Sequence, residues 1–373
     1  MVEAALLKHQ LNHDAVEQIR EIISAVHPGF DGSAFTRRAT DGLEQLELKA
    51  RVEHIVAALA THLPSGFCQT SRILEAAGDA WPTDSRERNW TNYAAWPLID
   101  YVSIYGLAYP QRAFQVLEKL TPLFTAEFAI RPFLQQHFEL THQQLLSWCQ
   151  HENEHVRRLA SEGIRPRLPW APQLRTLIED PNPIWPVLEQ LKADPSQYVR
   201  RSVANNLNDI SKDHAEQVLA LCRQWQKNQL DTTDWVIRHG LRTLVRSGYP
   251  EVFAVLGYTA EPKLSHIEFE LNASRISLGD TIILKLALTS AHKEAQQLVV
   301  DYRIQFVKAN GELGGKVFKW KNISLKSGET LRLEKKHAFK PISTRRYYPG
   351  RHRIDCLING QVVARAEVEL RKV

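Results

Sequence analysis

Apolar residues recur with the spacing of an α-helix over the first two thirds of the chain. In the segment 46–63 they occupy positions i, i+3, i+4 and i+7, namely Val52, Ile55, Val56 and Leu59, and so share one helical face. Comparable segments follow up to about residue 257, separated by short breaks that contain proline, glycine, asparagine or aspartate. This pattern predicts an all-helical region over residues 1–260.

The spacing changes after Glu261-Pro262. Runs such as Ile282–Leu288 and Val299–Val307 are rich in apolar and β-branched residues, and turn signals such as Asn310-Gly311 and Asn359-Gly360 lie between the runs. About seven strands in roughly 110 residues is typical of an immunoglobulin-like sandwich. The Cys…Trp…Cys pattern of antibody domains is missing, so residues 261–373 are expected to form an all-β sandwich without that disulfide.

Three related phrases occur within the helical region: His155–Ala160, Tyr198–Val203 and Val236–Leu241. Their spacing of roughly 40 residues is that of HEAT-type helical repeats, in which stacked helix pairs form a solenoid. The phrases align at the arginines Arg158, Arg201 and Arg238. We therefore predict a HEAT-like solenoid with basic side chains recurring along one face, as a phosphate backbone requires.

Charge is distributed unevenly along the chain. Residues 262–373 carry 21 Lys+Arg against 11 Asp+Glu, a net charge of +10. Because the whole chain has a net charge of +5, residues 1–261 have a net charge of −5. A basic sandwich indicates a polyanionic partner, although a solvated basic surface without a partner gives the same count.

The sequence gives little support for a metal site or a membrane-spanning segment. The cysteines Cys68, Cys149, Cys222 and Cys356 are scattered, and the histidines form no His-Glu-x-x-His motif, so we expect no disulfide, metal or cofactor. No apolar stretch reaches the about 18 residues of a membrane span, and no secretory signal is recognisable. A cytoplasmic protein is expected.

Several longer strings carry a family resemblance: Trp96–Val102, Ala126–Phe133, His155–Trp170, Val199–Ile210 and Trp235–Arg242. Together they resemble the AlkC branch of the AlkC/AlkD DNA glycosylases, bacterial enzymes of base excision repair, and the resemblance extends to the immunoglobulin-like domain. It implies hydrolysis of the N-glycosidic bond of cationic alkylated bases, 3-methyladenine and 3-methylcytosine, in double-stranded DNA. It also implies a monomer that needs no cofactor and does not flip the base.

Glu162, Asp209 and Glu127 lie inside these strings and are the candidate catalytic residues. A cationic base is already a good leaving group, so the enzyme must mainly stabilise an oxocarbenium-like sugar and orient a water, and carboxylates can do both. The alternative interpretation is that Glu162 and Asp209 only pair with the repeat arginines.

The candidate DNA contacts are cationic, amide or aromatic side chains in the repeats and in the basic sandwich loop. Trp170 follows a proline-rich segment and is suited to contact a sugar or cationic base, or else to fill the space between repeats. Because neighbouring arginines on a helix point about 100° apart, only about half of the set is expected to face DNA. The set is Arg157, Arg158, Arg165, Arg167, Trp170, Arg200, Arg201, Asn205, Arg238, His239, Arg242, Arg345, Arg346 and Arg351.

Two other functions remain open from the sequence. A DNA-binding protein without catalysis would keep the basic face but not aim its carboxylates at it. A protein–protein scaffold, the commonest role of HEAT solenoids, would have no affinity for DNA. The recurring arginines and the basic sandwich argue against the scaffold, and the carboxylates argue against the inert binder.

Overall fold

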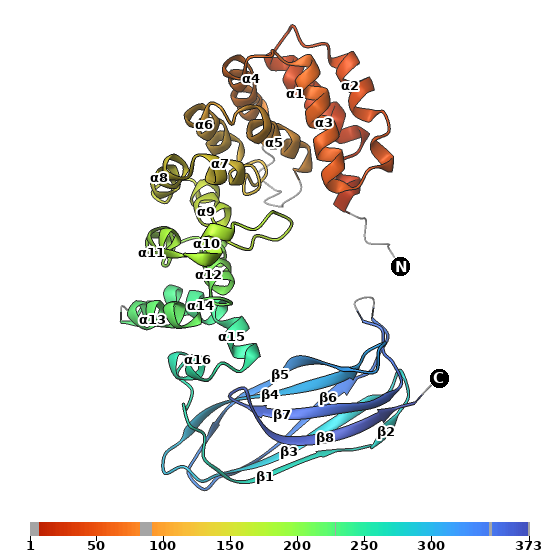
Figure 1. Ribbon diagram of the computed structural model, residues 1–373, viewed down its shortest axis with the longest axis vertical. Helices are drawn as coiled ribbons and strands as arrows, with labels where there is room; N and C mark the ends of the chain where they lie inside the picture. Colours follow the sequence, from red (N-terminus) through yellow and green to blue (C-terminus); the bar gives the residue numbers. More distant parts are fainter. Residues whose placement is uncertain (1–6, 83–91, 228, 343–344, 372–373) are drawn as a thin grey trace. The chain divides into compact units, whose positions relative to one another are not determined.

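The computed structural model describes residues 7–82, 92–227, 229–342 and 345–371. The helices precede the strands along the chain, as the sequence predicts (Figure 1). Contacts divide the chain into two compact units. The first unit comprises Met1–Asp213 with Leu230–Val236, and the second comprises His214–Gln229 with Ile237–Val373.

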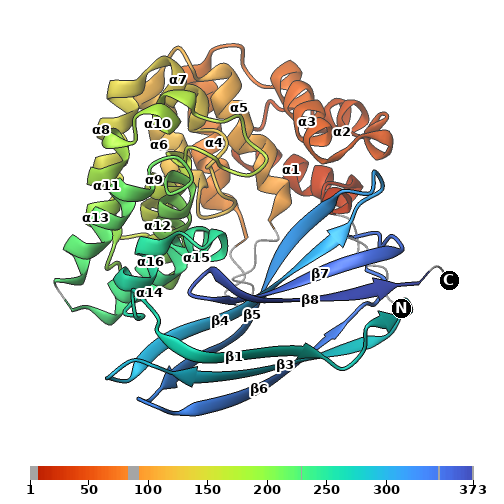
Figure 2. The same cartoon turned by 60° about the horizontal axis from the view of Figure 1, so that its bottom comes forward.

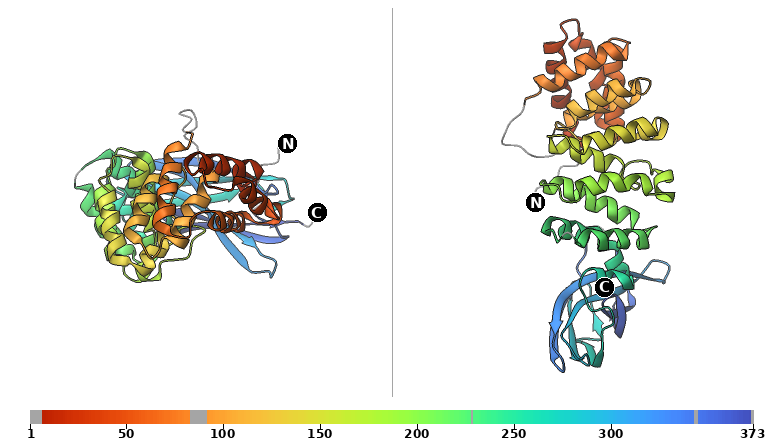
Figure 3. Two further views of the ribbon diagram at one scale, coloured as in Figure 1. Left: turned by 90° about the horizontal axis from the view of Figure 1, so that it is seen from above. Right: turned by 90° about the vertical axis from the view of Figure 1, so that its left-hand side faces the viewer.

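The first unit is a stack of helices. Helices α4, α6, α8 and α11 pack in series on one side, and α5, α7, α9 and α12 lie on the other (Figure 1). The layers of the stack are seen from another direction in Figure 3, right. Its helices are α1 (His13–Val26), α2 (Gly32–Thr40), α3 (Leu48–His62), α4 (Phe67–Ala80), α5 (Trp96–Tyr105), α6 (Pro110–Leu120), α7 (Arg131–Gln136), α8 (Phe138–Trp148), α9 (Glu154–Gly163), α10 (Arg175–Glu179), α11 (Trp185–Leu191) and α12 (Gln197–Ile210).

The predicted apolar face of helix α3 is confirmed. Val52, Ile55, Val56 and Leu59 are each at most 1 % exposed, and α3 packs against α2 and α5. Full burial of such a side chain contributes about 1.5–3 kcal/mol, so four of them on one face are enough to fix which side of α3 points inward.

The repeat phrases lie at equivalent positions of α9 and α12. Asn153 caps α9 and Ser196 caps α12, each accepting a hydrogen bond from the amide two residues further on. Arg157 donates from Nη1 to the carbonyls of His151 and Glu152, at 2.9 and 2.7 Å. Arg200 donates in the same way to the carbonyls five and six residues before it, at 2.9 and 2.5 Å. In these two phrases the first arginine therefore holds the turn that starts its helix.

The second unit joins the last helices to the sandwich. It contains α13 (Ala215–Gln226), α15 (Arg242–Ser247), α16 (Pro250–Val255) and the end of α14 (Asp231–Gly240). The helices end at Val255 and the strands begin at Leu264. The boundary between the two compact units, which is set by contacts between residues, lies earlier in the chain. The final helices thus belong to the same compact unit as the sandwich.

Two sheets form the sandwich, and the predicted all-β, immunoglobulin-like fold is confirmed (Figure 2). One sheet has the order β1-β3-β6 and the other β2-β8-β7-β4-β5; all pairs are antiparallel except β2 with β8. Apolar residues that alternate along β3, β4 and β7 fill the space between the sheets. The strands are β1 (Leu264–Leu271), β2 (Arg275–Ile276), β3 (Thr281–Ser290), β4 (Gln296–Val307), β5 (Leu313–Leu325), β6 (Thr330–Ala338), β7 (Gly350–Ile358) and β8 (Gln361–Leu370).

A close backbone contact fixes helix α15 against the β7–β8 turn. Gly248, which ends α15, and Gly360, in the turn, both have positive φ, and a Cβ on Gly360 would lie 2.2 Å from Cα of Gly248. Beside them, the side chain of Asn359 accepts from the amide of Val299 (2.7 Å) and donates to the carbonyl of Thr259 (2.8 Å). Only glycine fits at the crossing, because any side chain would push the two backbones apart.

Candidate active site

Five charged side chains of the first unit form an unbroken series of contacts. Arg158 on α9 contacts Glu127, at 2.5 Å between Nη1 and Oε2, and Glu162, at 3.4 Å between Nη2 and Oε1. Arg165 joins Glu162 (Nη1 to Oε1, 2.6 Å) to Asp209 on α12 (Nε to Oδ2, 2.8 Å). We call these five residues the carboxylate network. It brings together the three carboxylates that the sequence nominates for catalysis.

All five side chains of the network are buried, with at most 10 % of any of them exposed. Burial alone would raise the pKa of Glu162, but the guanidinium groups of Arg158 and Arg165 outweigh it and hold that pKa below its ordinary value. The same carboxylates raise the pKa of Arg158 and Arg165 against the effect of burial. Three carboxylates and two guanidinium groups give the network a formal charge of −1.

The three carboxylates differ in how fully they are bonded. Asp209 accepts from Arg165 at Oδ2 and from Lys212 at Oδ1 (3.0 Å). In Glu127, Oε2 accepts from both Thr125 (2.7 Å) and Arg158. Oε2 of Glu162, in contrast, is buried and makes no hydrogen bond within the described part of the chain. An unpaired buried acceptor is costly and rare in native proteins, so this oxygen sets Glu162 apart from the other two carboxylates.

Neighbouring side chains hold the network in place. The hydroxyl of Thr125 also accepts from Nη1 of Arg158 at 2.7 Å, and the ring of Tyr198 lies 4.8 Å from the guanidinium carbon of Arg158. The hydroxyl of Ser202 helps to lower the pKa of Glu162. The Oγ atom of Ser202 itself makes no hydrogen bond within the described residues. None of these three residues is among the site residues predicted from the sequence. Tyr198 opens the second repeat phrase, which is the one signal that points to it.

The loop between α9 and α10 presents Trp170. The indole is 61 % exposed, so it does not fill the space between repeats. Its backbone has φ = +64°, a left-handed conformation that side chains other than glycine, asparagine and aspartate rarely adopt. Such a conformation costs on the order of 1–3 kcal/mol and persists only where the surroundings enforce it. An exposed aromatic residue held in this way is a candidate contact for a ligand.

Five of the candidate DNA contacts are engaged within the protein. Arg158 and Arg165 belong to the network. Arg157, besides holding its turn, makes a two-point contact with Asp194, at 2.7 and 3.1 Å, and Arg200 holds the equivalent turn of α12. The fifth is Arg167, which pairs with Asp213 at the surface, at 3.0 Å.

Arg201 and Arg238 remain exposed at the repeat position that aligns with Arg158. Neither forms a hydrogen bond or an ion pair with any residue that the structure describes. The predicted stripe of basic side chains therefore lacks its first member at the surface, because Arg158 is turned into the network. Asn205 and His239 are half-buried, and Arg242 donates to the carbonyl of His239 at 2.6 Å.

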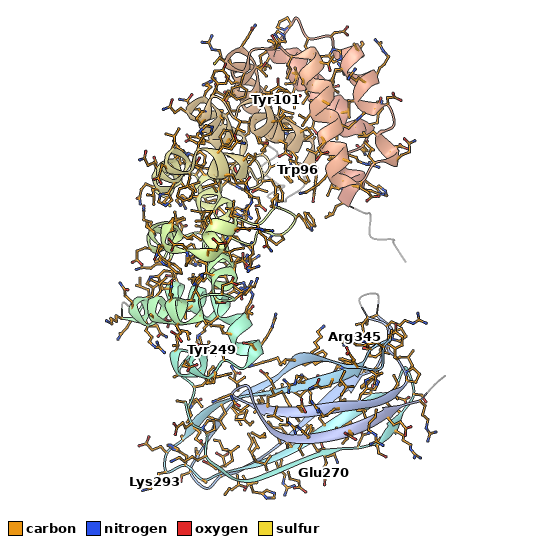
Figure 4. The ribbon with its side chains drawn as sticks, viewed as in Figure 1. Trp96, Tyr101, Tyr249, Glu270, Lys293 and Arg345 are labelled. Carbon is orange, nitrogen blue, oxygen red and sulfur yellow. The ribbon has the colours of Figure 1, made fainter. Side chains whose placement is uncertain are left out.

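Arg345 lies in the basic loop before β7 (Figure 4), and aromatic contacts anchor this loop. The guanidinium of Arg345 lies 3.9 Å from the ring centre of Phe306, and Arg346 lies 5.5 Å from that of Tyr348. Tyr347 packs against Phe306 as well. Arg351 is mostly exposed, with Nη1 3.5 Å from Oε2 of Glu367. The loop thus exposes positive charge while aromatic contacts hold it in place.

The sandwich also carries a basic cluster that the sequence analysis missed. Asp355 is fully buried on the outer side of the five-stranded sheet, under Arg303 (2.7 Å), Arg353 (3.3 Å) and Arg365 (3.5 Å). Three guanidinium groups on one carboxylate leave an excess of positive charge at the surface. Strand alternation places Arg353 and Asp355 on one face, but only the register puts Arg303 and Arg365 opposite Asp355.

The described residues contain no group of three or more histidine, cysteine, aspartate or glutamate side chains that could hold a metal ion. In the same part of the chain, no helix has the length and apolarity needed to span a membrane.

The helical region and the sandwich each match the model of a known protein family. Residues 124–244, which include the whole carboxylate network, match the model of the DNA alkylation repair enzymes. Residues 265–372 match the model of the C-terminal immunoglobulin-like domain of the uncharacterised protein YhaZ. The chain belongs to the AlkC-type family of DNA alkylation repair glycosylases.

Two relatives cover nearly the whole chain. The alkylpurine DNA glycosylase AlkC of Pseudomonas fluorescens, solved with DNA containing an abasic site analogue, is 38 % identical, with a TM-score of 0.88 over 98 % of this chain and 99 % of its own. The uncharacterised protein YhaZ of Bacillus subtilis is 37 % identical over 95 % of this chain and 97 % of its own. The resemblance drawn from the sequence is confirmed.

Proposed function

We propose that this protein hydrolyses the N-glycosidic bond of cationic alkylated bases, 3-methyladenine and 3-methylcytosine, in double-stranded DNA. The observation that carries the proposal is the buried carboxylate network with the unbonded oxygen of Glu162. As the glycosidic bond breaks, positive charge moves from the base to the sugar. Preorganised carboxylates beside the sugar stabilise that change without having to rearrange.

In the proposed reaction, a water attacks the anomeric carbon and the C–N bond breaks with its electron pair moving to the base. The base leaves neutral, the water loses a proton, and an abasic site remains. Oε2 of Glu162 orients the water and receives that proton. Asp209, which is bonded to a cation at each oxygen, and Glu127, whose Oε2 is bonded to Thr125 and Arg158, contribute negative charge beside the sugar.

The electrostatic role of Glu162 outweighs its role as a base. A general base is most effective when its pKa lies near the working pH. Arg158 and Arg165 hold the pKa of Glu162 below its ordinary value, so it stays ionised but accepts protons weakly. This is the behaviour required of a group that stabilises an oxocarbenium-like sugar.

DNA is proposed to contact the exposed cations of each unit. Arg201 serves the first unit and Arg238 the second, together with the loop that carries Arg345 and Arg346 and the cluster around Asp355. Such contacts act on phosphates and hold the duplex in register without reading its sequence. The proposal includes action as a monomer, without metal or cofactor, on a base that is not flipped into a pocket.

Release of free methylated bases from methylated duplex DNA, separated by chromatography, tests the proposal. Glu162→Gln should lower the rate by about 10²–10³-fold, the usual cost of one preorganised polar group, and leave DNA affinity unchanged. Glu179→Gln, an exposed carboxylate on α10, is the matched control. Release at the wild-type rate by Glu162→Gln would remove this residue from the mechanism.

Absence of base release by the wild-type protein, with salt-sensitive duplex binding retained, would instead indicate a DNA-binding protein in which the network is only structural.

A further inference from the structure

The loop between α9 and α10 is fastened at both ends and at its tip. We infer that Arg131 and Lys49 are positioning residues that hold Trp170 toward the damaged nucleotide. This inference rests on the proposed glycosylase function. Neither residue belongs to the carboxylate network, and neither is a candidate DNA contact.

Arg131 ties the two ends of the loop together from inside the protein. From helix α7, its Nη1 donates to the carbonyls of Gly163 (3.0 Å) and Arg165 (2.8 Å), and its Nη2 donates to that of Pro172 (2.5 Å). The side chain is buried, and burial together with the nearby charge of Arg165 lowers its pKa to about 10. A buried cation bonded to the last carbonyl of α9 and to two carbonyls of the loop fixes where the loop leaves α9 and where it returns.

Lys49 supports the tip of the loop from helix α3. Its ammonium donates to the carbonyl of Trp170 and lies 5.4 Å from the ring centre of Phe128. Phe128 directly follows Glu127 of the carboxylate network. Lys49 therefore connects the residue that presents the indole to the segment that carries a candidate catalytic group.

The backbone of Trp170 explains why such support is needed. Its φ of +64° is unfavourable for a tryptophan, so the residue would relax to negative φ if its carbonyl were released. Relaxation would swing the indole to a new direction. Because the ring is 61 % exposed, little packing inside the protein would oppose that movement. What Lys49 and Arg131 keep in place is therefore a ring that faces outward.

A double-mutant cycle on the full-length protein tests the inference, with base release from methylated duplex DNA as the first measurement. Lys49→Met should lower kcat by about 10–100-fold, the loss that a displacement of about 1 Å at a reacting centre can give. Lys49→Met should cause no further loss in a Trp170→Ala background, because it acts only through Trp170. Lys49→Arg should recover most of the rate. Lys119→Met, an exposed lysine on α6, is the control.

Equal losses from Lys49→Met with and without Trp170, or no loss in either background, would overturn the inference.

Amide hydrogen exchange separates this inference from the proposed function. The amides of Ala171 and Leu174 donate to the carbonyls of Leu168 and Pro166, at 3.3 and 3.1 Å. Lys49→Met and the milder Arg131→Lys should speed exchange at these amides while leaving α9 protected. If the wild-type protein releases no base but exchange does accelerate, the glycosylase proposal fails and the support of the loop stands. Unchanged exchange in both variants would refute the support itself.

Discussion

Arg165→Gln is the substitution that most directly tests the carboxylate network. Arg165 bridges Glu162 and Asp209 at 2.6 and 2.8 Å, and its side chain is only 8 % exposed. The change leaves Arg158 as the remaining cation of the five-residue network, whose formal charge moves from −1 to −2, while Lys212 still contacts Asp209 from outside it. Breaking a buried ion pair in this way typically costs about 3–5 kcal/mol, because the remaining charge stays buried without its partner.

Arg167→Gln supplies the matched control for stability. Arg167 lies two residues further along the same loop and also forms a two-point ion pair, at 3.0 and 3.1 Å to Asp213. Both partners are partly exposed, at 26 and 32 %, so water screens the pair. Loss of such a pair costs about 1 kcal/mol or less. Denaturant unfolding should therefore separate the two variants by at least about 2 kcal/mol.

Arg165→Gln should also change how the stability of the protein depends on pH. In the wild type the pKa of Glu162 is lowered on folding, so the ionised carboxylate adds stability above its unfolded pKa. That stability is lost as the pH falls through the folded pKa. Without Arg165 the pKa of Glu162 is expected to rise, and acid unfolding should begin at a higher pH. Equal stabilities of the Arg165 and Arg167 variants, with an unmoved acid transition, would refute the assignment of Arg165 to the network.

Two further predictions concern other parts of the chain. Gly360→Ala should destabilise the protein by more than about 1 kcal/mol in thermal unfolding, because its Cβ would meet Gly248 and because φ is positive there; wild-type stability would show that the crossing can relax. Arg201→Gln should make the negative slope of log K against log salt for duplex binding less steep by about 0.9, because one phosphate contact is lost. Arg157→Gln should leave the slope unchanged, since Arg157 is bound to Asp194. Equal slopes in the wild type and the Arg201 variant would mean that Arg201 does not meet a phosphate.

Much of the architecture is determined by local spacing along the sequence. The i, i+3, i+4, i+7 pattern of α3 predicts the buried face that the structure has, since any helix of that sequence gathers those side chains on one side. The alternating runs after residue 261 predict the sandwich for the same reason. The repeat phrases also place the caps of α9 and α12 at matching positions.

The fate of the repeat arginines could not be predicted in this way. Arg158 and Arg201 occupy the same position of related phrases that share the sequence Val-Arg-Arg, yet Arg158 is buried and Arg201 is exposed. The difference lies in what packs beside each helix. Glu127 and Thr125, more than thirty residues earlier in the chain, meet Arg158 and bind its guanidinium. No local pattern encodes that meeting.

The sequence by itself therefore determined the two kinds of region, the helical faces, the repeat register and the residue types available for chemistry. These depend on the 3.6-residue and 2-residue periods of a single chain segment. Tertiary structure alone decided which charges are paired, which oxygen of Glu162 is left unbonded, and how Trp170 is presented. Burial and pairing depend on groups brought together from distant parts of the chain. Asp209 meets Arg165 across 44 residues, and Lys49 meets Trp170 across 121.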